Sequence, residues 1–265
     1  PLLQQHHGAS HTFTVDTAVY KQLQSLCRSE GCTLFTLLLA SYSLLLHRYT
    51  GQEEVIIGTP MTNRNRAELE ALIGCFLNSL ALRFTFANQP TFRSYLRYVQ
   101  SVATSVYAHQ EMPFEVLLEY LPVARDTSRH PLFQTMFTLA EDYVEQSWQS
   151  TELKLVRSRE IVGANSSKFD LTVHVSEADA YLNITFNYDS DLFEASSMQR
   201  MAAHFHRLLG AIVAQPDVAI TQLPLLTQQQ RQQQLVEWND TARPYPKEIN
   251  IHQQFERQLR LHPNA

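Results

Sequence analysis

Two adjacent histidines near the start of the chain, His6 and His7, are the residues that most invite a catalytic or metal-binding interpretation. Neutral imidazole is a good ligand for divalent ions and titrates near neutral pH. However, no carboxylate or cysteine stands nearby, and His11 is the next imidazole along the chain. The pair also precedes the first segment with a regular apolar pattern. We therefore expect residues 1–11 to be a poorly ordered start or a connecting segment, without a metal site.

A polar residue on an apolar strand face is a second candidate. In "CFLNSLALRFTF", residues 75–86, apolar side chains alternate with polar ones, as in a half-buried strand. This alternation places Asn78 on the same face as Phe76, Leu80 and Leu82. An unpaired buried amide costs about 1–3 kcal/mol. Asn78 should therefore either bond a neighbouring backbone or point into a polar cavity, unless a bulge turns it away.

Two further stretches combine titratable groups with turn residues. "HQEMPFE", residues 109–115, predicts a corner between helices, because His109 suits a helix end and Pro113 suits a helix start. "RDTSRHPL", residues 125–132, predicts a loop that Asp126 orders and that Arg125 and Arg129 clamp. The alternative for this loop is that it binds a phosphate on a partner.

The helices and strands that must position these residues can be predicted from the spacing of apolar residues and from capping residues. Helical spacing indicates helices over 16–30 and 33–51, with Asp16 and Thr33 as N-caps and Gly31 and Gly51 as stops. Further helices are expected over 92–106, after Pro113 and over 201–213. Period-two patterns predict strands at 75–86, 132–140, 167–177 and 181–189. A short β-branched run predicts a buried strand at 53–58, and residues 152–162 are expected to be an edge or hairpin strand. Such interleaving predicts an α/β or α+β layered domain over residues 12–225.

The composition excludes several function classes. The 265 residues carry a net charge of −5 with scattered basic residues, which argues against nucleic acid and an anionic membrane surface as partners. The seven glycines form no nucleotide-binding loop and no hydrolase elbow. Cys27, Cys32 and Cys75 fit neither a disulfide framework nor a C-x-x-C metal site, so reduced thiols are expected. No apolar run reaches membrane-spanning length, and we expect a soluble, cytoplasmic protein.

The amino-acid composition of the chain changes after residue 225. "LPLLTQQQRQQQ" is polar and glutamine-rich, and "WNDTARPYPKE" contains two prolines, so residues 226–248 are predicted to be a linker. Residues 249–265 resemble the first helix of another domain, because Ile251, Phe255 and Leu259 recur at helical spacing.

In their order and spacing, the three stretches resemble the condensation domains of nonribosomal peptide synthetases. The motifs of that family read I-G-x-F-V-N-T-x-x-x-R, H-Q-D-x-P-F-E and R-D-x-S-R-N-P-L. Departures here are mild: Leu77, Ser79, Glu111 and His130 replace Val, Thr, Asp and Asn. The positions that match the motifs are Gly74, Phe76, Asn78, Arg83, His109, Gln110, Pro113, Phe114, Arg125, Asp126, Ser128 and Arg129.

The resemblance implies a fold of two chloramphenicol-acetyltransferase-like lobes with a tunnel between them, each lobe a mixed sheet flanked by helices. This chain resembles the C-terminal lobe alone, followed by a linker and the start of an adenylation domain. The implied reaction is amide formation between substrates tethered to carrier domains through 4'-phosphopantetheine arms, with no cofactor bound here. Implied partners are the missing N-terminal lobe, upstream and downstream carrier domains and the adjacent adenylation domain.

The same resemblance assigns roles to residues. The family's H-H-x-x-x-D-G motif belongs to the N-terminal lobe, and after His6-His7 the Asp-Gly positions read His11-Thr12. We therefore expect no catalytic residue in this chain and no activity of the chain alone. Asn78 and Ser79 should line the tunnel and Arg83 should support them. Asp170 and His174 either meet the missing lobe or face solvent.

Two other classes of function stay open. The chain could be a binding module that docks carrier or adenylation domains without catalysis. It could also belong to a sibling enzyme on the same scaffold, for epimerisation, heterocyclisation or coenzyme-A-dependent acyl transfer.

Overall fold

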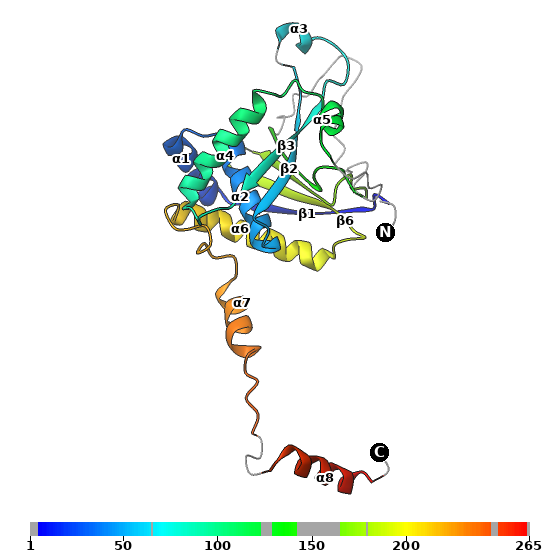
Figure 1. The fold of residues 1–265 in the computed structure, drawn as a ribbon. Coiled ribbons are helices and arrows are strands. Elements are labelled where there is room, and N and C mark those ends of the chain that lie inside the picture. Colours follow the sequence, from blue (N-terminus) through cyan, green and yellow to red (C-terminus); the bar gives the residue numbers. More distant parts are fainter. Residues whose placement is uncertain are drawn as a thin grey trace, which may run out of the picture. The chain divides into compact units, whose positions relative to one another are not determined.

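The computed structural model describes residues 5–64, 66–122, 129–141, 165–178, 180–244 and 249–263 (Figure 1). The chain divides into two compact units, residues 1–225 and residues 226–265. Arg125, Asp126 and Ser128 lie outside the described residues, as does the strand expected at 152–162.

The first two helices begin and end at the predicted caps. Helix α1 spans Thr17–Glu30, and Asp16 Oδ1 accepts the amide hydrogens of Ala18 and Val19 at 2.9 Å. Helix α2 spans Leu34–Thr50 behind the Thr33 cap. Gly31 and Gly51 follow with φ of 63° and 68°, in the left-handed conformation that glycine adopts without a Cβ penalty.

A six-stranded mixed sheet forms the centre of the first unit. Its strands are β1 (Gly8–Val15), β2 (Glu54–Met61), β3 (Asn78–Thr85), β4 (Thr135–Glu141), β5 (Leu171–Glu177) and β6 (Leu182–Asp189), in the order β1-β6-β5-β4-β2-β3. β4 runs parallel to β2 and β5, and the other neighbours are antiparallel. The predicted class, a mixed sheet flanked by helices, is confirmed.

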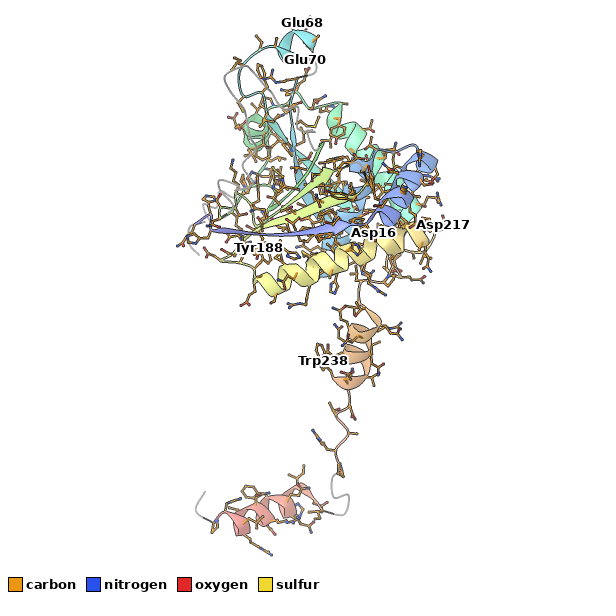
Figure 2. All side chains as sticks on the ribbon, turned by 180° about the vertical axis from the view of Figure 1, so that it is seen from behind. Asp16, Glu68, Glu70, Tyr188, Asp217 and Trp238 are labelled. Carbon is orange, nitrogen blue, oxygen red and sulfur yellow. The ribbon has the colours of Figure 1, made fainter. Side chains whose placement is uncertain are left out.

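Helices α1, α2, α4 (Phe92–Tyr107) and α6 (Ala195–Ala214) pack against one face of this sheet (Figure 1). That face is apolar: Leu82, Phe137, Val173 and Phe186 are fully buried on four different strands. Helix α5 (Phe114–Tyr120) packs at the start of β3. The short α3 (Ala67–Glu70) projects from the body with Glu68 and Glu70 and buries no residue (Figures 1 and 2).

Residues 1–11 were expected to be poorly ordered or a connecting segment, and poor order is wrong from Gly8 onward, because these residues form β1. Gly8 pairs with Asp189 and His11 with Phe186 in the ladder to β6. His6 Nδ1 lies 3.0 Å from Ser167 O, and His7 Nδ1 lies 3.0 Å from Asp191 Oδ2. Apolar and polar residues do alternate here, but β1 depends on a partner strand far away in the sequence, which local patterns do not reveal.

The second unit is more helical than a plain linker. Thr227 and Gln230 form a reciprocal capping box that begins α7 (Gln228–Gln232), and the π-helical turn η1 (Gln233–Glu237) follows it. Trp238 is exposed beyond it (Figure 2). The glutamine run therefore acts through its helix propensity and a cap, where its polarity alone had suggested a linker. The predicted C-terminal helix is confirmed as α8 (Ile251–Leu261).

Within the described residues, no single helix is long and apolar enough to cross a membrane. Helices α1 and α2 have the length together, but they meet at a bend of 106°.

Gly58 on β2 gives a direct test of the packing, because a Cβ at this position would overlap the ring of Phe133. We expect Gly58→Ala to lower the free energy of unfolding by about 1–3 kcal/mol, the usual cost of overpacking. Gly210→Ala in α6 is the control: its Cβ meets no atom within 4 Å, and it should stabilise by about 0.5–1 kcal/mol. Urea titration measures both. If Gly58→Ala adds independently to Phe133→Leu, the overlap is not the cause.

Candidate functional site

The side chain of Asn78 joins the first two motifs. Its Nδ2 donates to the backbone oxygens of Gln110 and Met112, at 2.8 Å each. Its Oδ1 accepts the amide hydrogens of Phe114 at 3.1 Å and Ser79 at 3.0 Å. A side-chain amide offers two donors and two acceptor lone pairs, so its hydrogen-bonding capacity is used completely. Of the two alternatives for Asn78, bonding to neighbouring backbone is the one that occurs.

Arg83 does not support Asn78, contrary to expectation. It lies on the opposite face of β3, where Nη2 donates to Glu54 Oε1 at 2.5 Å, and both side chains are more than half exposed. The reason is strand geometry, because residues separated by an odd number point to opposite faces. Ser79 is half-buried on the Arg83 face of the strand.

The predicted helix–helix corner at "HQEMPFE" is confirmed. Helix α4 ends at Tyr107, and His109 Nδ1 lies 2.9 Å from Ser105 O in the preceding turn. Pro113 stands directly before α5 in an extended conformation, with φ of −63°. Phe114 is buried at the first position of that helix. The three hydrogen bonds from the Asn78 side chain to the backbone of Gln110, Met112 and Phe114 hold this corner against the start of β3.

Four aromatic rings gather next to the corner. His130 stacks on Phe114 with ring centres 5.3 Å apart, and its ring lies 4.2 Å from that of Phe133 and 5.1 Å from that of Phe169. Phe133 covers Gly58 on β2. Burial in this aromatic cluster lowers the pKa of His130. The third motif therefore meets the second through His130, one of the positions that depart from the family pattern.

Asp170 and His174 lie apart from this cluster. Asp170 precedes β5, and burial together with the charge of Asp189 raises the pKa of its carboxyl group, although the charge of Arg129 partly opposes this. His174 lies on the exposed face of β5, and its Nδ1 is 2.9 Å from Thr138 Oγ1 on β4. Partial desolvation of the ring by its neighbours lowers the pKa of His174.

His174 belongs to a polar row across several strands, which was not predicted from the sequence. Thr138 lies beside His174 on β4, and Thr185 lies beside it on β6 and hydrogen-bonds Thr12 Oγ1 at 2.9 Å. The available signal was the alternation of polar residues, Ser10, Thr12 and Thr14 in β1 and Asn183, Thr185 and Asn187 in β6. Among the residues that the structure describes, no three His, Cys, Asp or Glu side chains are placed to hold a metal ion.

The comparisons with known proteins agree on one family. The family model described as "Condensation domain" matches residues 2–235. A linear gramicidin synthase from Brevibacillus parabrevis is 42% identical over 271 residues, which cover 99% of this chain and 5% of that protein. Tyrocidine synthase 3 from the same organism is 36% identical over 263 residues, which cover 99% of this chain and 4% of that protein. The chain therefore spans a small part of the relatives it matches.

Solved structures give the same fold. A four-domain nonribosomal peptide synthetase bound to AMP and glycine superposes with a TM-score of 0.76 at 26% identity, covering 86% of this chain and 18% of that one. The X-domain in its complex with OxyB from teicoplanin biosynthesis superposes with a TM-score of 0.76 at 23% identity. The match covers 86% of this chain and 50% of that one. At that lower identity the likeness concerns the fold alone.

Asn78→Asp tests the bonds to the corner. Aspartate keeps the shape and one acceptor oxygen but loses both donors, so the carbonyls of Gln110 and Met112 would face a carboxylate. We expect a loss of about 1–3 kcal/mol in the free energy of unfolding. Because repulsion from the two carbonyls moves the carboxylate away from the corner, we also expect faster hydrogen exchange at the Phe114 amide. Arg83→Gln, on the exposed face of the same strand, should change neither quantity. Unchanged exchange at Phe114 in Asn78→Asp would contradict the proposed bonding.

The lowered pKa of His130 predicts a pH dependence of stability. The folded state binds this proton less readily than the unfolded chain, whose imidazole titrates near about 6.5. Acidification through that range therefore favours the unfolded state. We expect His130→Asn, which restores the residue of the family motif, to flatten the fall in stability between roughly pH 7 and pH 5. Denaturation midpoints of both proteins across that range provide the check. Parallel pH profiles of the two proteins would mean that His130 does not contribute to the pH dependence of stability.

Proposed function

This chain belongs to the condensation-domain family, and we propose that it is the C-terminal lobe of such a domain, followed by a linker and the start of an adenylation domain. Coverage supports the proposal, because the chain matches 50% of the X-domain chain. The division of the chain at residue 225, together with a following amphipathic helix, is consistent with a lobe and a linker. The apolar face of that helix is exposed through Ile251, Phe255 and Leu259, as expected for a helix that completes another domain.

The proposed reaction is formation of a peptide bond between substrates on two carrier domains. The amine of the acceptor attacks the thioester carbon of the donor, a C–N bond forms, the C–S bond breaks, and the donor carrier keeps a free thiol. The attacking amine must lose a proton, which a positioned histidine can accept. We assign that base to the preceding N-terminal lobe, because His6-His7 lacks the Asp-Gly of the family motif and both rings contact neighbouring residues instead.

The convergence of the three motifs on Asn78 and Phe114 is the observation that carries this proposal. We propose that β3 borders the substrate tunnel, with Asn78 on one face of the strand and Ser79 and Arg83 on the other. In this arrangement Asn78 is a positioning residue, since its amide is fully bonded to the protein. The substrates arrive on phosphopantetheine arms, so the lobe itself needs no cofactor.

We further propose that the polar row containing His174, together with Asp170, faces the N-terminal lobe. The hydroxyl and imidazole groups of this row hydrogen-bond one another in pairs and retain capacity for a partner surface. The similarity to synthetases, one of them a four-domain nonribosomal peptide synthetase, supports carrier and adenylation domains as further partners. A cytoplasmic location is part of the same proposal.

A non-catalytic docking module is the second candidate. One structure with this fold is a complex of the X-domain with OxyB, so the scaffold also occurs in an assembly with another protein. The two candidates differ in one sequence feature. An intact H-H-x-x-x-D-G motif upstream favours catalysis, and its loss favours docking.

Reconstitution tests the catalytic proposal. The chain is assayed for dipeptidyl-carrier formation alone and with an added N-terminal lobe. We expect product only with both lobes, and loss of about 10²–10⁴-fold when the histidine motif of the added lobe is removed. His6→Ala and His7→Ala in this chain should leave the rate nearly unchanged. Turnover by the isolated chain, or a loss in His7→Ala as large as that from the upstream motif, would overturn the assignment.

A further inference from the structure

Two of the three cysteines meet at the end of α1. Cys27 is buried in the last turn of the helix, and Cys32 follows Gly31 and is half-buried. The Cys32 amide donates to Cys27 O at 3.0 Å, and Gly31 has φ of 63°. These features define a Schellman C-cap, in which the residue after the glycine lies against the residue five positions earlier. The cap therefore brings the two side chains together.

The two thiols interact directly and differ in character. The Cys27 thiol hydrogen-bonds the sulfur of Cys32, which lowers the pKa of Cys32. The same contact, reinforced by burial, raises the pKa of Cys27. The thiolate is the nucleophile in thiol chemistry, so Cys32, the more accessible of the two, is the attacking group. Cys27 is placed to resolve a mixed disulfide on Cys32.

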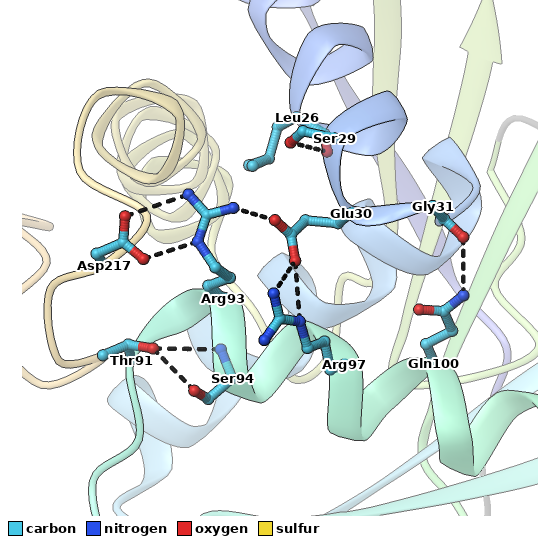
Figure 3. Close-up of polar contacts among 10 residues, drawn as sticks. All are labelled: Leu26, Ser29, Glu30, Gly31, Thr91, Arg93, Ser94, Arg97, Gln100 and Asp217. Carbon is cyan, nitrogen blue, oxygen red and sulfur yellow. Dashed lines mark hydrogen bonds and ion pairs between the residues drawn. The ribbon is translucent and has the colours of Figure 1, made fainter.

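The corner that holds these thiols is clamped to α4 (Figure 3). The Glu30 carboxylate, only 3% exposed, pairs with Arg93 and with Arg97, the latter at 3.0 Å. Gln100 Nε2 donates to Gly31 O at 2.9 Å. These contacts hold the segment between the two cysteines at Glu30 and at Gly31. The fold therefore keeps the two cysteines at neighbouring positions.

We propose that Cys27 and Cys32 form a dithiol modification site that a small organic disulfide oxidises reversibly to an intrachain disulfide. The Cys32 thiolate attacks one sulfur of the small disulfide, breaks its S–S bond and releases one small thiol. Cys27 then loses its proton and attacks the Cys32 sulfur, releasing the second small thiol. The two cysteines are oxidised and the small disulfide is reduced, so electrons and protons balance.

Cys75 is the internal control for this site. It is exposed in the segment before β3, and the other two cysteines pair with each other. Exposure makes it accessible to the same oxidant, but it has no resolving thiol in the Schellman position. It should stop at the mixed disulfide, whereas Cys27 and Cys32 should proceed to the bridge.

Arg28 makes the bridge easy to detect, because trypsin cleaves between the two cysteines. The protein is treated with oxidised glutathione, unfolded under acid quench and digested. We expect peptide 22–28 covalently joined to peptide 29–48, with the pair released by dithiothreitol and glutathione found on Cys75. Recovery of the two peptides unlinked while Cys75 carries glutathione would overturn the proposal.

Variants test the assigned order and the role of the cap. Cys27→Ser should leave Cys32 as a persistent glutathione adduct, and failure of Cys32 to react there would contradict its role as the attacking thiol. Gly31→Ala strains the left-handed cap, whereas Gly31→Asn tolerates it. Nothing lies within 4 Å of a Cβ at this position, so only the backbone conformation is disturbed. We expect slower bridge formation in Gly31→Ala than in Gly31→Asn. Equal rates would show that the cap does not align the thiols.

Discussion

Three of the four hydrogen bonds of the Asn78 side chain connect the first residue of β3 to the corner between α4 and α5, and the fourth joins it to Ser79 in β3. Because this corner is a loop, its backbone groups cannot pair within a helix and need partners elsewhere. Asn78 supplies them from an already fixed strand. Phe114 is thereby directed into the aromatic cluster that covers Gly58. One amide therefore determines where two motifs, a short helix and an aromatic cluster lie relative to the sheet.

A second fixed corner stands at the C-terminal end of α1. There the buried carboxylate of Glu30 is compensated by two arginines of α4, and Gly31 turns the chain in a conformation that most other residues adopt only with strain. A buried charge without partners would be costly, so this ion cluster is a strong constraint on how α1, α2 and α4 meet. The pairing of Cys27 with Cys32 is a direct consequence of that constraint.

The two corners differ in what they contribute to function. The Asn78 corner belongs to the motifs that resemble those of the condensation family, and its saturated hydrogen bonding gives Asn78 a structural role in holding the corner. The α1 corner carries no family motif. Two residues of this scaffold that could move a proton, His130 and His174, have pKa values lowered by desolvation. Both are therefore neutral near pH 7, suited to hydrogen bonding and packing.

The sequence by itself determined the helices with their caps, the alternating strands and the family, because each of these depends on residues close together in the chain. Asp16, Thr33, Gly31 and Gly51 act locally, and their predicted roles are confirmed. Only the tertiary structure decided the partner of β1, the partners of Asn78 and the pairing of Arg83 with Glu54. These depend on which distant segments pair, since a side chain with two possible partners takes the one that the fold brings within hydrogen-bond distance.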